Sequence, residues 1–318
     1  MKTLSRALLA GIGIVAFAGT ASAEDFPSQK LDVVLHASAG GGTDITLRQV
    51  MPGTEKALGQ RIEVLSKRGG NGVVSLKYLE HAKPDGYTAF TLTASHLAAI
   101  ISGKTSFTLD DLYCLARLTN DPQYFMAKTG KFSSAEDMIK DITSRPIKIG
   151  GDAVGGTDHL SVASFSSKMP ESFDYTYVPF DGAPGTAAAL VNGDIDLGVV
   201  NYSEAIPMIE GGRIEPVMVL ADERQDVAPN VPTAKELGIN STYSSLRDIM
   251  TLTAVPEDRR KILSEAFYAG TQTEGFQKYL KEIGLSGKTV AASEACNAQL
   301  KVMYDDTAAA MKAIGLLN

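Results

Sequence analysis

Strand-like apolar runs alternate with segments of helical periodicity almost from one end of the chain to the other. Alternation of this kind is typical of βα units, in which helices cover both faces of a mostly parallel sheet. The sequence therefore predicts an α/β protein, with strands at residues 31–37, 61–66, 87–93, 147–151, 195–200 and 215–220.

The pattern becomes wholly helical after residue 256, with helices predicted at 257–268, 273–283 and 293–314. Because these helices need a sheet to cover, we expect the chain to return to the first domain. Divisions are indicated at 120–122, where an Asp-Pro turn separates strand-like segments 113–118 and 124–127, and at 244–248. We therefore expect a first domain of residues 24–121 plus 246–318, a second of residues 122–245, and a hinge at the two crossings.

Two local signals concern helix boundaries. Pro52 interrupts a helix predicted at 43–58, and because proline lacks a backbone donor we expect a kink or two short helices there. Thr233 and Glu236 have the spacing of a capping box, with Gly238 as the stop of a short helix.

The first 23 residues have the features of a signal peptide. Lys2 and Arg6 precede an apolar stretch at 7–19, and small residues end at Ala23, where cleavage is expected. The apolar stretch is shorter than the ~20 residues that span a bilayer. The sequence therefore predicts export across the inner membrane into the periplasm.

Removing the two basic residues of this segment lowers the formal net charge from −7 to −9. Because basic residues form no patch, nucleic acid is excluded as an expected partner. We also expect the protein to be a monomer. Cys114 and Cys296 are the only cysteines. An oxidising compartment would allow them to pair, and two buried free thiols are an equal alternative.

Two glycine-rich segments follow predicted strands and open predicted helices. Residues 40–44 read GGGTD and residues 155–158 read GGTD. In this context backbone N–H groups point at an anion beside a helix N-terminus. The alternative is that the glycines only make tight turns. We expect Thr43 and Thr157 to contact a ligand, and Asp44 and Asp158 to cap their helices.

Signatures of catalysis and of nucleotide binding are missing. Ile45 stands where a dinucleotide fingerprint needs its third glycine, and no phosphate-loop lysine follows Gly150. The four histidines never occur at the spacing of a helical metal pair, and no Gly-x-Ser-x-Gly motif occurs. We therefore expect a binding protein rather than an enzyme, with no catalytic residue, metal or cofactor.

Several short motifs together carry a family resemblance. They are residues 39–44 (AGGGTD) with Arg48, 58–60 (LGQ), 68–72 (RGGNG), 84–88 (PDGYT), 178–182 (VPFDG), 192–196 (NGDID) and 231–238 (VPTAKELG). Over essentially the whole mature chain, the sequence resembles the solute receptors of tripartite tricarboxylate transporters, including the Bordetella uptake gene group.

The resemblance implies a type II periplasmic binding protein clamshell, with two α/β domains joined by a hinge. It also implies that the two glycine-rich loops hold a ligand carboxylate, largely through backbone groups and water, and that the receptor delivers it to a large and a small membrane subunit. The implied substrate-binding residues are Ser38, Gly41, Gly42, Thr43, Asp44, Thr93, Ser95, His96, Gly155, Gly156, Thr157, Asp158, His159, Phe180, Asp181 and Asn201.

The sequence leaves open which carboxylate is bound, what Asp181 and His159 contact, and which function the binding serves. The carboxylate is expected to be a di- or tricarboxylate or an aromatic one. Asp181 would either accept a bond from a ligand hydroxyl or ammonium group or cap the helix that starts near Gly182. His159 would either donate to the ligand or be structural. A sensor that presents its ligand to a signalling partner, or an exported hydrolase, are the alternative functions.

Overall fold

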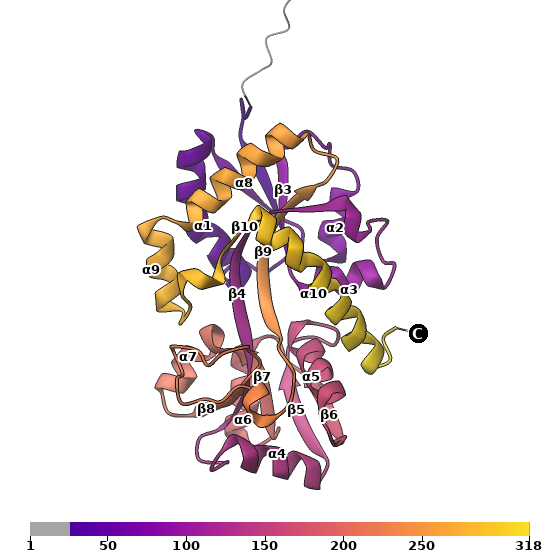
Figure 1. Ribbon diagram of the computed structural model, residues 1–318, viewed down its shortest axis with the longest axis vertical. Helices are drawn as coiled ribbons and strands as arrows, with labels where there is room; N and C mark the ends of the chain where they lie inside the picture. Colours follow the sequence, from indigo (N-terminus) through magenta and orange to yellow (C-terminus); the bar gives the residue numbers. More distant parts are fainter. Residues whose placement is uncertain (1–25, 318) are drawn as a thin grey trace, which may run out of the picture.

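Two long strands run through the whole molecule and pair with each other. They are β4 (Leu112–Lys128) and β9 (Ser244–Leu252), antiparallel to one another. The computed structural model describes residues 26–317, so the predicted signal peptide and its cleavage site lie outside the described residues. Figure 1 shows β4 and β9 connecting an upper and a lower group of elements. The strand order is β2-β1-β3-β9-β4-β7-β5-β6, with β8 and β10 also paired to β4.

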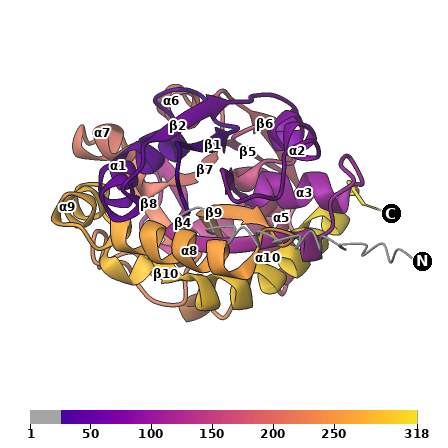
Figure 2. The same cartoon turned by 90° about the horizontal axis from the view of Figure 1, so that it is seen from above.

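The upper group is built on parallel strands that meet β9. β1 pairs with β2 and β3 in parallel, and β3 pairs with β9 in antiparallel orientation. Figures 1 and 2 place α1 on one side of this group and α2 and α3 on the other. Its elements are β1 (Leu31–Leu35), α1 (Gly42–Leu58), β2 (Ile62–Ser66), α2 (Val73–Leu79), β3 (Thr88–Leu92) and α3 (Ala94–Ile101).

The lower group repeats the βα design. β5 lies between β6 and β7 in parallel, and β7 and β8 each pair with β4 in antiparallel orientation. Its elements are α4 (Ala135–Ser144), β5 (Ile147–Gly151), α5 (Thr157–Lys168), β6 (Tyr175–Pro179), α6 (Ala183–Asn192), β7 (Leu197–Asn201), α7 (Tyr202–Glu210) and β8 (Ile214–Val219). Single 3₁₀ turns occur at Gly70–Gly72, Leu109–Asp111, Lys235–Leu237 and Gly287–Thr289.

The C-terminal segment is helical, as expected, apart from the two-residue strand β10 (Ala291–Ala292). Its helices are α8 (Glu257–Thr271), α9 (Glu274–Glu282) and α10 (Ser293–Ala313). α8 packs on α1, whereas α10 packs on α3 at the upper group and on α5 of the lower group. Ala310 and Met311 share an apolar cluster with the lower group. The last helix therefore packs on both the upper and the lower group.

All six predicted strands are present, with ends within two residues of the expected ones. Residues 113–118 and 124–127, predicted as separate strands, belong to the single strand β4. Pro122 does not end it because β4 changes partner at this point, from β9 up to Pro122 to β7 from Gln123 onward. The predicted strands did not include β6 and β9.

The two predictions about helix boundaries had different outcomes. α1 is one helix with Pro52 inside it, so the alternative of two short helices is wrong, and a kink at Pro52 stays a prediction. The capping box is confirmed, since the N–H of Thr233 donates to the Glu236 carboxylate and the N–H of Glu236 donates to the Thr233 hydroxyl. Among residues 26–317, no helix is long and apolar enough to cross a membrane.

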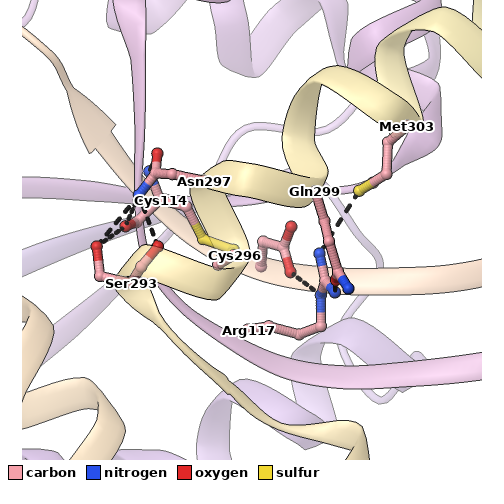
Figure 3. The surroundings of a disulfide bond; sticks show 8 residues. Cys114, Arg117, Ser293, Cys296, Asn297, Gln299 and Met303 are labelled. Carbon is pink, nitrogen blue, oxygen red and sulfur yellow. Dashed lines mark hydrogen bonds and ion pairs between the residues drawn. A yellow bond between two sulfur atoms is a disulfide. The ribbon is translucent and has the colours of Figure 1, made fainter.

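A disulfide joins the first turn of α10 to β4. Cys114 and Cys296 are fully buried, with Cα atoms 5.9 Å apart and a sequence separation of 182. Figure 3 shows the polar contacts beside it: the Asn297 amide pairs with the backbone N–H and carbonyl of Cys114, at 2.9 and 2.8 Å. Arg117 donates to Asp248 at 3.0 Å in the same region. The disulfide therefore fixes the start of α10 to the strand that connects both groups.

Replacing both cysteines with alanine should lower the free energy of unfolding. The bridge closes a loop of 182 residues, and loss of such a constraint on the unfolded chain costs about 2 to 5 kcal/mol. Denaturant titration measures the change. A thiol reductant should destabilise the wild type and leave the double variant unaffected; equal stability of the oxidised wild type and the variant would contradict this role.

Candidate functional site

The first glycine-rich loop leaves a helix N-terminus free. α1 begins after Gly41, and no side chain caps it. Asp44 is turned back into the loop, where its carboxylate accepts from the N–H of Gly40 at 2.8 Å and from Arg48 at 2.9 Å. The N–H of Gly41 donates to the carbonyl of Ser38. The first backbone donors of α1 are therefore available to an anion.

A guanidinium lies directly against this loop. A methyl group at Gly42 would come within 2.6 Å of Nη2 of Arg247 and 3.2 Å of Oε1 of Glu204. Arg247 is on β9, opposite Thr119 of β4, and Glu204 is in the first turn of α7. The absent side chain at position 42 thus lets a cation and a carboxylate meet at the positive end of α1.

Arg247 is held by acids on two different elements. Its Nη1 lies 3.5 Å from Oδ2 of Asp121, and its Nη2 lies 3.3 Å from Oε1 of Glu204. Asp121 also accepts from the hydroxyl of Ser203. Burial raises the pKa of Asp121 to about 6, although Arg247 and Ser203 oppose that rise. The network joins β4, β9 and α7 beneath the first loop.

The second glycine-rich loop differs because it contains its own anion. The Asp152 carboxylate lies against Gly156, where an added methyl group would come within 2.3 Å of it. Burial raises the pKa of Asp152 to about 6, while the backbone N–H groups of Asp158, His159 and Thr157 act to lower it. The expectation that both loops offer free donors needs correction here, since the donors of α5 already face a carboxylate.

Asp158 adds a second carboxyl group to this loop. Its Oδ2 accepts from the N–H of Asp152 at 2.9 Å. Burial and the nearby charges of Asp152 and Glu204 raise its pKa well above the ordinary value. The side chain of Gln123, on the same face of β4 as Asp121, acts to lower the pKa of Asp158. Glu204 thus lies between the two loops. It is next to Gly42 of the first loop, and its charge interacts with Asp152 and Asp158 of the second loop.

His159 and Thr157 are buried in the lower group. The His159 ring stacks on Tyr177 with centroids 4.0 Å apart, and its Nδ1 accepts from the N–H of Gly155. Burial lowers its pKa, so the ring is neutral at pH 7. A hydrogen bond links this loop to the upper group, since the Asn71 amide donates to the carbonyl of Val154 at 3.4 Å.

The expected residues after β3 form an internal network. Thr93 and His96 make a reciprocal capping box at the start of α3, and Nε2 of His96 lies 3.1 Å from the Ser75 hydroxyl. His36 packs edge-on against His96, with centroids 4.2 Å apart. Burial lowers the pKa of His36 to about 4 and the pKa of His96 well below its ordinary value, so both rings are neutral at pH 7. Ser95 is half-buried.

The residues expected at the far wall have mostly structural contacts. Asn201 donates to the carbonyls of Asp121 and Pro122, at 2.8 and 3.1 Å, which ties β7 to β4. Phe180 packs against Gly150 and Gly185. Asp181 is exposed, and the N-cap of α6 is Gly182, with no capping side chain.

A pocket of about 500 Å³ lies on the opposite face of the paired strands. Side chains alternate along β4 and β9, so Asn120, Pro122, Ser244 and Leu246 line this pocket. Thr119, Asp121 and Glu204, which contact Arg247, do not line this pocket. This rear pocket is therefore separated from both glycine-rich loops by the strand pair.

Within residues 26–317, only Cys114, Cys296 and Asp248 are close enough to hold a metal as a trio. Both sulfurs belong to the disulfide, so they are not free as ligands. The trio is better explained as part of the α10 attachment.

Asp121, Asp152, Glu204 and Arg247 are not among the residues expected from the sequence. Three of them had a signal, since Asp152 directly follows a predicted strand and Asp121 and Arg247 lie at the predicted domain divisions. Charges at such positions, where carboxyl ends of strands meet, are typical of ligand sites in open α/β sheets.

Comparison with known proteins agrees with this architecture. The family model described as "Tripartite tricarboxylate transporter family receptor" matches residues 46–315. Protein BugT of Bordetella pertussis is 26% identical over 73% of this chain and 74% of its own length. The crystal structure of a TctC solute binding protein from Polaromonas is 24% identical, with a TM-score of 0.78 over 92% of this chain and all of that one.

MatC from Rhodopseudomonas palustris, whose structure is described with bound malate, is 23% identical, with a TM-score of 0.73 over 90% of this chain and 99% of that chain. These likenesses establish the α/β periplasmic binding protein fold. The chain is thus a solute-binding protein rather than an enzyme, and it belongs to the receptor family of tripartite tricarboxylate transporters.

Proposed function

We propose that this protein is a periplasmic receptor that captures a small carboxylate and delivers it to the large and small membrane subunits of a tripartite tricarboxylate-type transporter. The observation that supports the carboxylate most directly is the uncapped N-terminus of α1 next to Arg247. Backbone donors, the helix dipole and a guanidinium together stabilise a carboxylate. A protein of the same fold is described with bound malate, a dicarboxylate.

The ligand carboxylate would bind at residues 41–43, with the side chain of Thr43 as an additional donor. The rest of the ligand would extend toward the second loop, at residues 155–159. Residues 24–121 with 246–318 would then form one domain and residues 122–245 the other, hinged where β4 and β9 cross. Closure over the ligand would exclude water and strengthen the charged contacts.

Delivery to a transporter is supported by family membership, since the family is described as receptors of such systems. A sensor would share the same site and differ in the partner that reads the bound state. Only the family membership favours transport over sensing, because the same ligand contacts would serve a transporter or a signalling partner.

Carboxylates should raise the melting temperature of the mature protein. A ligand that binds only the folded state adds about 2.7 kcal/mol of stability at 100 times its Kd. Protein stripped of ligand by unfolding and refolding would be titrated with mono-, di-, tri-, aromatic and amino-substituted carboxylates. Glucose and putrescine, which lack a carboxylate, serve as controls; a shift with these alone, or with no compound, would refute the carboxylate assignment.

Gly42→Ala should weaken ligand binding by about tenfold or more, since its methyl group would displace Arg247 from the loop. Gly275→Ala is the matched control, because an added methyl group at Gly275 in α9 meets nothing within 4 Å. Calorimetric titration compares the two. Unchanged affinity in the folded Gly42→Ala protein would rule out the first loop as the carboxylate site.

Asp152→Asn should stabilise the protein at neutral and basic pH. The pKa of Asp152 is raised from 3.8 to about 6 in the folded state, so its ionised form destabilises the fold, and that cost is relieved as pH falls from 7 toward 4. The variant should gain on the order of 1–2 kcal/mol at pH 8, and the gain should shrink toward pH 4.

Denaturant titration across this pH range measures the effect of Asp152→Asn. Asp194→Asn, at an exposed position, provides the control for removing one negative charge. A destabilised Asp152→Asn protein at pH 8 would mean that the ionised carboxylate instead supports the N-terminus of α5.

A further inference from the structure

The surroundings of Arg247 contain more acids than one guanidinium balances. Asp121 and Glu204 lie within 3.5 Å of it, and Asp152 and Asp158 are close enough to Glu204 for their charges to interact. The histidine of the second loop is neutral and adds no positive charge. A ligand that carried only negative charge would enter a region that already has an excess of it.

Two buried acceptors in this region have no donor. Oδ1 of Asp121 and Oε1 of Gln123 lack a hydrogen-bond partner, although the residues are 1% and 0% exposed. Both side chains project from the same face of β4 as Thr119, which bonds Arg247. Buried acceptors without partners are costly, so a bound group with several N–H donors would satisfy them.

The positions of the opposite charges restrict the ligand further. Nη2 of Arg247 and Oε1 of Glu204 are 3.3 Å apart and both lie beside Gly42. A carboxylate that binds Arg247 and the N-terminus of α1 therefore places its adjacent atoms next to the Glu204 carboxylate. A ligand group that donates to Glu204 and Asp121 therefore has to be attached close to the ligand carboxylate. This is so when the donor group and the carboxylate are bonded to the same carbon atom.

We propose that the ligand is an α-amino acid, with its carboxylate at the first loop and Arg247 and its α-ammonium group against Glu204 and Asp121. This assignment rests on the proposed receptor function and specifies the substrate class of the same site. An ammonium group has three donors and one positive charge, which matches the unpaired acceptors and the excess of acids. The side chain of the amino acid would point toward the second loop.

Matched ligand pairs test the ammonium group. L-aspartate with succinate, L-glutamate with glutarate, and L-phenylalanine with 3-phenylpropionate differ only by the α-ammonium group. At least one amino acid should bind the stripped wild-type protein about tenfold or more tightly than its partner, as expected for added hydrogen bonds to charged groups. In calorimetric titrations, tighter binding of the unsubstituted acids throughout would overturn the proposal and leave the carboxylate receptor standing.

Two variants on α7 locate the effect. Glu204→Gln should reduce the affinity ratio between the amino acid and its unsubstituted partner by about tenfold. Glu210→Gln, at the exposed end of the same helix, should leave the ratio unchanged. An unchanged ratio in a folded Glu204→Gln protein would refute the contact. If no compound in either set binds, the proposed function fails, which is distinct from failure of the amino acid assignment.

Discussion

The antiparallel pairing of β4 with β9 is the constraint on which the rest of this structure depends. Each strand crosses from one group of parallel strands to the other, and alternate side chains point to opposite faces of the pair. One face presents Thr119, Asp121, Gln123 and Arg247 below the first loop, whereas the other lines the rear pocket. The strand pair that connects the two groups is therefore also the floor of the candidate site, so contacts of the proposed ligand with Arg247 would be made on this connection.

The two glycine-rich loops show how similar sequences acquire different electrostatic roles. Both follow a strand and open a helix, and in both an aspartate at the fourth matched position accepts from a nearby backbone N–H. The difference comes from Asp152, because the corresponding position of the first loop is Ser38, which carries no charge. One helix N-terminus thus remains positive while the other faces an internal carboxylate. This asymmetry gives the site a polarity, with an end for anions and an end for donors.

The sequence alone was sufficient for the fold class and for most strands, because apolar runs between helical segments are a local signal. It failed where the fold depends on long-range pairing. Pro122 reads as a turn but lies where β4 changes partner, and α10 packs on the lower group through Met311 as well as on the upper group. At the site, the loops could be recognised from their glycines. The network of Asp121, Glu204 and Arg247 could not, because its members come from three elements far apart in sequence.

A crystal structure of the protein with the carboxylate that most raises its melting temperature would test the central claim most directly. We expect the ligand carboxylate to accept hydrogen bonds from the backbone N–H groups at the start of α1 and from Arg247, with Asp152 still facing the N-terminus of α5. A carboxylate bound at α5 in place of Asp152, or in the rear pocket lined by Asn120 and Leu246, would contradict it.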